Sequence, residues 1–329
     1  MGGDYAPSVN VEGAVETVTE YEDIDVTLVG DSKLIEKELG YKRFTGNRIL
    51  LQHASQVVGM NESPTTAIRK KKDSSIRVGI ELVKSGKADA FVSAGHSGVI
   101  MATSLLLLRT TPGVDRPAIA AIMPTLRDTF VLIDAGANVD CKPENLLEFA
   151  LMGNTYCKLV LGRPEPKVAL LGIGEEDTKG NELTKEAFKL IRKTKINFIG
   201  NIEGKDIFSG LADVVVCDGF IGNIALKISE GLAETVLRML KREITSVSSG
   251  RVGYLLMKPA IRNFKKRTDY DEYGGAPLLG INGVAIISHG RSSAKAIKNA
   301  LRVAADFAAK KVPEAISADI EYNLKDTAH

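Results

Sequence analysis

Lys179 is the residue of this sequence best placed to do chemistry, because it lies in a polar loop between an apolar run and a helical pattern. An ammonium group in such a loop can bind an anion or stabilise a developing oxyanion. Most loop lysines are only solvated, but glycine neighbours and a place at the end of a predicted strand favour function. Glu176, Asp177 and Asn181 share the loop and are expected to contribute to a substrate site.

The same loop departs from two common phosphate-binding motifs. It begins like a dinucleotide fingerprint, but Asp177 stands where the third glycine belongs, and carboxylates there do not suit a pyrophosphate. The Walker pattern also fails, because Lys179 precedes Gly180 and is not followed directly by serine or threonine. We therefore expect neither a nicotinamide site nor an NTPase site in this loop.

A second candidate loop runs from Asp218 to Asn223 after an apolar run. Asn223 and Lys227 share a helix face at i,i+4 spacing, and the start of such a helix suits a phosphate or an oxyanion. Gly219 and Gly222 allow the backbone to approach a ligand closely. The alternative is that Asp218 and Asn223 are turn and cap residues, which their types fit equally well.

A third loop has the sequence Gly95-His96-Ser97-Gly98. It nearly matches the nucleophile elbow of α/β-hydrolases, with His289 downstream, but its second glycine is out of register. The alternative is that Ser97 caps the helix that follows. The two histidines could act as acid and base, but neither has a partner at metal-ligand spacing, so no metal site is expected.

The elements that must position these loops form an alternating α/β pattern, which predicts βαβ units around a mainly parallel sheet. Strands are predicted at residues 26–29, 49–52, 90–93, 119–123, 130–133, 168–171, 197–199 and 214–217. Helices are predicted at residues 74–85, 98–108, 143–161, 182–194, 224–241 and 293–309. A fourth loop, residues 134–138, contains Asn138. Because ligands bind beyond the carboxyl ends of parallel strands, we expect the four loops to line one cleft.

The composition indicates an intracellular globular protein. Hydrophobic residues make up 44% and charged residues 26%, and the net charge of +2 gives no reason to expect nucleic-acid binding. Three cysteines without a C-x-x-C pair fit a reducing compartment. Neither a signal peptide nor a membrane span is predicted. Residues 1–329 are expected to form one interlocked body, with two lobes dividing near residues 161–166, where glycine and prolines interrupt a helix.

Two basic segments are candidates for partner contacts. The first is the run Arg69, Lys70, Lys71 and Lys72, which would attract an acidic partner, although such runs are mostly solvated. The second, residues 251–273, is apolar on one side and basic on the other, which suits an anionic membrane surface or a dimer contact. Its candidate membrane residues are Leu255, Leu256, Met257, Lys265 and Lys266.

Six motifs occur in order over nearly the whole chain: residues 1–4, 93–98, 134–140, 174–182, 218–223 and 273–276. Together they resemble the bacterial phosphate acyltransferase family PlsX. The resemblance implies that inorganic phosphate attacks the thioester of a long-chain acyl group on acyl carrier protein, giving acyl phosphate for phospholipid synthesis without a dissociable cofactor. It also implies a three-layer αβα fold like that of isocitrate and isopropylmalate dehydrogenases, and a homodimer.

The resemblance further implies a cytoplasmic enzyme peripherally attached to the inner face of the plasma membrane, where a glycerol-phosphate acyltransferase uses its product. It places Lys179 and Asn223 at the reacting centre as catalytic residues. The expected phosphate and substrate site comprises Gly95, His96, Ser97, Gly98, Asn138, Glu176, Asp177, Asn181, Asp218, Gly219 and Gly222. The run 69–72 would contact the acidic carrier protein, and the segment 251–273 the membrane.

The sequence departs from the family pattern at two places. Family members usually begin with a short apolar strand ahead of the Met-Gly-Gly-Asp motif, so a strand is expected there. The family commonly has Asn-Thr where this chain has His96-Ser97, and histidine protonation is expected to make phosphate binding depend on pH. The alternatives to the transferase are a hydrolase of acyl thioesters, an NAD(P)-dependent dehydrogenase of the same fold superfamily, and a non-catalytic scaffold.

Overall fold

The computed structural model describes residues 1–246, 253–254, 256–262, 264 and 272–324. The helices are α1 (Ser8–Glu20), α2 (Ser32–Tyr41), α3 (Pro64–Lys70), α4 (Ser75–Lys84), α5 (Ser97–Leu108), α6 (Pro143–Leu159), α7 (Glu182–Ile191), α8 (Gly219–Ser246), α10 (Ala294–Ala309) and α11 (Val312–Leu324). The strands are β1 (Val26–Gly30), β2 (Ile49–His53), β3 (Phe91–Ser93), β4 (Ala118–Pro124), β5 (Thr129–Ile133), β6 (Val168–Gly172), β7 (Phe198–Glu203), β8 (Val214–Val216), β9 (Ala276–Leu279) and β10 (Ala285–Ile287).

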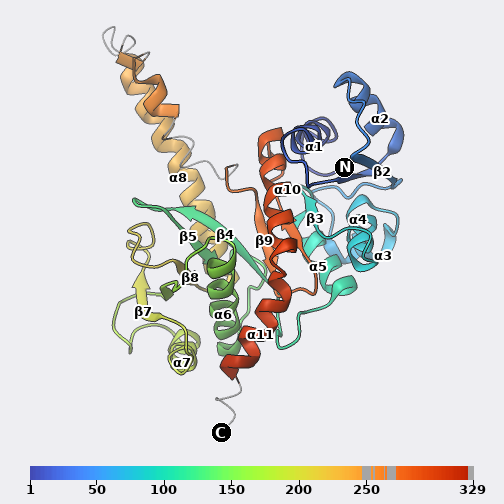
Figure 1. Ribbon diagram of the computed structural model, residues 1–329. Coiled ribbons are helices and arrows are strands. Elements are labelled where there is room, and N and C mark those ends of the chain that lie inside the picture. The colour runs from blue at the N-terminus through green and yellow to red at the C-terminus, as the bar shows by residue number, and fades with distance from the viewer. Residues whose placement is uncertain (247–252, 255, 263, 265–271, 325–329) are drawn as a thin grey trace.

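The centre of the molecule is an eight-stranded sheet in the order β3-β10-β9-β4-β5-β8-β6-β7, with helices on both of its faces (Figure 1). Strands β1 and β2 form a separate parallel pair beside α1 and α2. The predicted α/β fold with a mainly parallel sheet is therefore confirmed. All of the predicted strands and helices are present, while α1, α2, α3, α11, β9 and β10 were not predicted.

Around β5, β8 and β6 the core forms two apolar layers that share these strands. Along β5, Val131 and Ile133 pack into the layer under α6, α10 and α11, while Phe130 and Leu132 pack into the opposite layer. This alternation is the period of a β-strand whose two faces are both covered. Strands β8 and β6 repeat it, so this half of the sheet is a rigid support for the loops at its end.

Three of the four candidate loops follow strands that run in the same direction, and the loop 95–98 does not; that all four line one cleft stays a prediction. Strand β4 pairs antiparallel with both β5 and β9, and β9 pairs antiparallel with β10. Strands β3 and β10 therefore run opposite to β5, β8 and β6. The gap between β4 and β5 is residues 125–128, which is too short for a parallel crossover and requires a hairpin.

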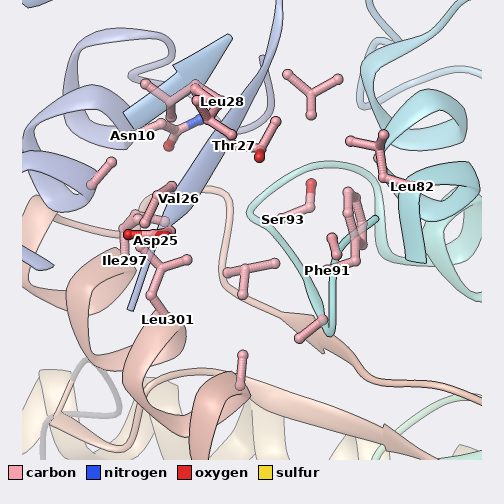
Figure 2. Close-up of a pocket in the computed structure, with 18 of the residues that line it drawn as sticks. Asn10, Asp25, Val26, Thr27, Leu28, Leu82, Phe91, Ser93, Ile297 and Leu301 are labelled. Atoms are coloured by element: carbon pink, nitrogen blue, oxygen red, sulfur yellow. The ribbon is translucent and has the colours of Figure 1, made fainter. Parts of the chain in front are cut away.

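A cavity of about 480 Å³ separates β1 from β3 (Figure 2). Its lining includes Val26, Leu28 and Phe91, and the Met1 ammonium donates to the Val29 carbonyl oxygen at 3.1 Å. Burial lowers the pKa of that ammonium to about 6. None of the residues proposed for chemistry lines this cavity. The expectation of a further strand ahead of the Met-Gly-Gly-Asp motif at residues 1–4 stays a prediction.

Glu148 is a carboxyl group buried in the packing of α6, where its Oε2 accepts the Asp115 backbone N–H at 2.9 Å. Burial raises the pKa of Glu148 to about 7, and the neighbouring charges of Asp115 and Glu144 act in the same direction. The pKa of Glu148 is higher in the folded state than its ordinary value of 4.5, so the protonated carboxyl stabilises the folded protein. This stabilisation is fully present at pH values below 4.5. That contribution is lost as the pH rises through about 7.

We therefore expect Glu148→Gln, which mimics the protonated carboxyl, to change how stability depends on pH. The melting temperature of the variant relative to the wild type should rise between pH 5 and pH 7, and level off above the pKa of about 7. Thermal unfolding followed by circular dichroism at each pH measures this difference. Glu36→Gln, an exposed change on α2, is the control. A pH-independent difference for Glu148→Gln would contradict the assignment.

Candidate active site

Three of the predicted loops leave adjacent strands at one edge of the sheet. Strand β8 pairs in parallel with β5 on one side and with β6 on the other. The loops that follow these strands, residues 134–138, 218–223 and 172–182, therefore emerge side by side. This arrangement brings the segment of Lys179 and the segment of Asn223 to neighbouring strand ends, as ligand sites of α/β proteins require.

The loop 134–138 is folded around the buried side chain of Asp134, which is 0% exposed. Its Oδ1 accepts the backbone N–H groups of Ile119, Gly136 and Ala137 at 3.0, 3.1 and 2.9 Å. Its Oδ2 accepts the backbone N–H of Asn138 at 2.6 Å and the Asn138 side-chain amide at 2.9 Å. Both oxygens act only as acceptors in these contacts, which is the pattern of an ionised carboxylate.

Burial raises the pKa of the Asp134 carboxyl, and the N–H donors around it act in the opposite direction. Asn138 completes this cluster, because its amide also donates to the Pro117 carbonyl oxygen at 2.8 Å. Both amide hydrogens of Asn138 are thus directed at protein acceptors. The Asn138 amide therefore stabilises the loop by linking Asp134 to Pro117. A contact of Asn138 with substrate stays a prediction.

The start of α8 is pressed against this loop. The Gly219 N–H donates to the Asn138 carbonyl oxygen at 2.7 Å, and a Cβ atom on Gly222 would lie 1.9 Å from the Asp134 carbonyl oxygen. Asn223 follows at once, with its Cβ 3.2 Å from the position that a Cβ on Gly136 would take. The side chain of Asn223 is exposed, so its amide can reach a ligand.

Asp218 behaves as the turn and cap residue that its type allows. Its Oδ1 accepts the Ile221 backbone N–H at 2.9 Å, and its carbonyl oxygen accepts the Gly222 N–H at 2.9 Å. Two N–H groups in the first turn of α8 are therefore satisfied within the protein. A ligand at this helix start would meet the Asn223 side chain before these backbone donors.

In the loop 172–182, three polar groups have contacts that support the fold. Asn181 caps α7 by accepting the Thr184 N–H at 2.9 Å, and Asp177 forms an ion pair with Arg192. The Glu176 carbonyl oxygen accepts the Asn201 side-chain amide at 3.0 Å. Lys179 is exposed, with its Cβ and Cγ against Gly174. Its ammonium is the cation that this loop presents to solvent.

The loop 95–98 follows β3 and by strand direction leaves the other edge of the sheet. It packs on the N-terminal motif, because a Cβ atom on Gly2 would lie 2.9 Å from the Gly95 nitrogen. The helix begins at Ser97, and His96 occupies the N-cap position without a side-chain cap bond. Ser97 is therefore not the cap. The contribution of residues 95–98 to substrate binding stays a prediction.

The basic run 69–72 ends α3 and extends into the turn that follows. Arg69, Lys70 and Lys72 are exposed, whereas Lys71 is held by an ion pair with Glu62. In the second basic segment, Leu256 and Met257 are exposed. Leu255, Lys265, Lys266 and much of the range 251–273 lie outside the described residues.

Neither a metal cluster nor a thiol nucleophile is found in the part of the chain that the structure describes. No three His, Cys, Asp or Glu side chains converge there as metal ligands. Burial raises the pKa of the Cys217 thiol well above its ordinary value, so this cysteine is a poor thiolate donor at neutral pH. No helix of the described residues has the length and apolar character to cross a bilayer.

Comparison with known proteins places the chain in a family. The profile of a family described as "Fatty acid synthesis protein" matches residues 1–315. A protein named phosphate acyltransferase from Thermodesulfovibrio yellowstonii is 57% identical over 96% of this chain and 91% of its own length. One of the same name from Geobacter sulfurreducens is 52% identical over 98% of this chain and 92% of its own length. The chain belongs to the phosphate acyltransferase family. It is therefore an acyltransferase.

Solved structures confirm the fold class. A phosphotransacetylase from Streptococcus pyogenes superposes with a TM-score of 0.64 at 19% identity, over 92% of both chains. The phosphotransacetylase EutD from Staphylococcus aureus gives a TM-score of 0.60 at 19% identity, over 90% of this chain and 89% of its own. A 4-hydroxythreonine-4-phosphate dehydrogenase from Klebsiella pneumoniae gives a TM-score of 0.53 at 12% identity, over 92% of this chain and 95% of its own. The fold is thus shared by acyltransferases and dehydrogenases, and the loops must decide the chemistry.

The close approach of Gly222 to Asp134 generates a prediction. Gly222→Ala would force its Cβ against the Asp134 carbonyl oxygen and shift the start of α8, which carries Asn223. We expect a loss of unfolding free energy of about 1–3 kcal/mol, as in other overpacked sites, together with reduced acyl transfer. Chemical denaturation and turnover measure the two effects.

Gly40→Ala is the matched control for this variant. Gly40 lies in α2, and a Cβ atom there would meet nothing within 4 Å. Alanine is the better helix former, so we expect this variant to gain about 0.5–1 kcal/mol and to keep its activity. A Gly222→Ala variant with wild-type stability and turnover would show that the contact is not tight.

Proposed function

We propose that this acyltransferase moves a long-chain acyl group from acyl carrier protein to inorganic phosphate, giving acyl phosphate for phospholipid synthesis. The observation that carries the proposal is the adjacency of three loops at the ends of β5, β8 and β6. They bring an exposed lysine, an exposed asparagine amide and a glycine-lined helix start to one edge. The named relatives, similar over nearly their whole length, support the reaction type.

In the proposed reaction, a phosphate oxygen attacks the thioester carbonyl carbon and forms the new O–C bond. The carbonyl electron pair moves to oxygen, and the tetrahedral intermediate then expels the thiolate as its C–S bond breaks. The products are acyl phosphate and the free thiol of the carrier protein. Such a reaction needs phosphate to be neutralised and held close to the carbonyl, and it needs an oxyanion donor.

Lys179 and Asn223 are the residues proposed for these tasks. The exposed ammonium of Lys179 suits the charge of phosphate and would hold one of its oxygens for attack. The amide of Asn223 would donate a hydrogen bond to phosphate or to the oxyanion from the neighbouring strand end. No protein nucleophile is needed in this route, because phosphate itself forms the bond to the acyl group.

The test of this proposal follows thiol release from acyl carrier protein thioester with and without phosphate. We expect release to require phosphate, and Lys179→Ala to reduce turnover by about 10²-fold, the usual cost of losing a charge-stabilising donor. Lys185→Ala, an exposed change on α7, is the control and should keep turnover. Release without phosphate would indicate a hydrolase, and absence of release a non-catalytic scaffold.

The carrier protein is proposed to dock on the run 69–72. Arg69, Lys70 and Lys72 are exposed and can meet an acidic partner, and such charges mainly accelerate association. The segment 251–273 is proposed to contact the inner face of the plasma membrane, where exposed Leu256 and Met257 suit an acyl boundary. A glycerol-phosphate acyltransferase at that surface would consume the acyl phosphate.

A homodimer is proposed on the long helix α8, which projects from the body beyond its first turns (Figure 1). One face of α8 carries an apolar stripe that a monomer would leave in water: Ile221, Ile224, Ile228, Leu232, Val236 and Met239, exposed by 40–63%. Stripes of this kind favour association with a complementary surface, and a second copy of the same helix is self-complementary.

We expect Leu232→Asp to shift the protein from dimer to monomer, because the new carboxylate would be buried without a partner in the interface. Size-exclusion chromatography with light scattering measures the mass. Lys241→Glu, which changes an exposed side chain on the opposite face of α8, should leave the mass unchanged. A Leu232→Asp protein with the mass of the wild type would place the interface elsewhere.

A further inference from the structure

We infer that Asp134 is a positioning residue for the reacting centre: its buried carboxylate fixes the start of α8 and thereby sets the place of Asn223. This inference rests on the proposed function, in which Asn223 touches the reacting atoms. Asp134 itself is buried and does not contact substrate. Its effect is transmitted through the backbone of two loops.

Asp134 already fills the anion site of its own loop. The N–H groups of Gly136, Ala137 and Asn138 converge on its two oxygens at distances between 2.6 and 3.1 Å. Converging backbone N–H groups of this kind commonly hold a phosphate. Here they are turned inward to an internal carboxylate. Phosphate must therefore be held from the outer side, where Lys179 and Asn223 are exposed.

The loop 134–138 is in direct contact with the start of α8. The Asp134 N–H donates to the Cys217 carbonyl oxygen at 3.0 Å, so β5 and β8 are joined up to the point where their loops begin. Beyond it, a Cβ atom on Gly219 would lie 2.7 Å from the Asp134 Oδ2 and 2.6 Å from the Asn138 carbonyl oxygen. The first turn of α8 thus rests on the carboxylate and on the loop that the carboxylate folds.

Asn223 has little freedom to stay in place if the loop 134–138 changes shape. It lies in the first turns of α8, directly after Gly222, which rests on the Asp134 carbonyl oxygen. A change in the shape of the loop must move Gly222 and Asn223 together, because they share one helix. Displacement of a reacting group by about 1 Å can cost about 10²-fold in rate.

The test compares two Asp→Asn variants. Asp134→Asn keeps the shape of the side chain but replaces one of the two acceptor oxygens with an NH₂ group. This donor would face backbone N–H groups that are also donors. Asp319→Asn is the matched control. Asp319 is a carboxylate on α11 that accepts from Thr155 Oγ1 at 2.7 Å and from the Asn323 side-chain amide at 3.1 Å. It belongs to α11, which packs on α6, and to none of the three loops.

Both variants are expected to lower the melting temperature. Only Asp134→Asn is expected to lower kcat, by about 10²-fold, in assays run at a temperature where both proteins are folded. KM for the carrier thioester should stay unchanged, and the stabilisation produced by added inorganic phosphate should shrink. A folded Asp134→Asn protein with wild-type kcat, or equal losses of kcat in both variants, would overturn the inference.

A milder variant keeps the inference testable if Asp134→Asn does not fold. Asn138→Ala removes the amide that links Asp134 to Pro117 but leaves the carboxylate and its backbone donors. It should show the same loss of kcat to a smaller extent, and a folded Asn138→Ala protein with wild-type kcat contradicts the inference. A wild-type protein that releases thiol without phosphate would instead contradict the proposed function, before any variant is compared.

Discussion

A buried carboxylate must be satisfied by hydrogen-bond donors, and in this protein the carboxylate of Asp134 imposes that constraint on the loop that follows β5. The donors come from its own loop and from the start of β4, so the strand ends are tied together before any ligand arrives. Replacing or shifting such a group would leave several backbone N–H groups without acceptors. The hydrogen bonds therefore hold the loop in one shape. The start of α8 packs on this loop and is held in place by the same contacts.

This stiffness has a functional consequence. Strands β5, β8 and β6 are covered on both faces, so the loops at their ends are mounted on a rigid core. Catalysis by orientation requires that reacting groups stay in place, and loops on buried parallel strands meet that need. Lys179 is an exposed side chain of the loop 172–182, whereas Asn223 is held in the first turns of α8.

Much of the fold was predictable from the sequence. The strands β4, β5, β6 and β8 are continuous apolar runs of the kind that buried strands require, and helices such as α4 and α7 have clear apolar faces. Strands β9 and β10 were not predicted, because they are four and three residues long and lie among glycines. The reversed direction of β4 relative to β5 was not predicted either. The short gap between them was the signal that could have shown it.

The residue types of the candidate site were predictable from the sequence, but which of them cap helices or hold a loop was less so. Asp218 and Asn181 are caps in the structure, as their residue types allowed. Ser97 is not a cap, because the helix begins one residue earlier than its apolar pattern indicates. Asp134 does not stand out in the sequence, because an aspartate after an apolar strand is an ordinary turn residue. Only the folded structure shows how many donors converge on it.

The measurement that tests the account most directly is hydrogen–deuterium exchange of the wild-type protein with and without inorganic phosphate. The account predicts slower exchange on phosphate binding in residues 174–181 and 219–223, the loops that present Lys179 and Asn223 at the ends of β6 and β8. Protection confined to residues 95–98, at the end of β3, would place the phosphate at the other edge of the sheet. That result would contradict the proposed reacting centre.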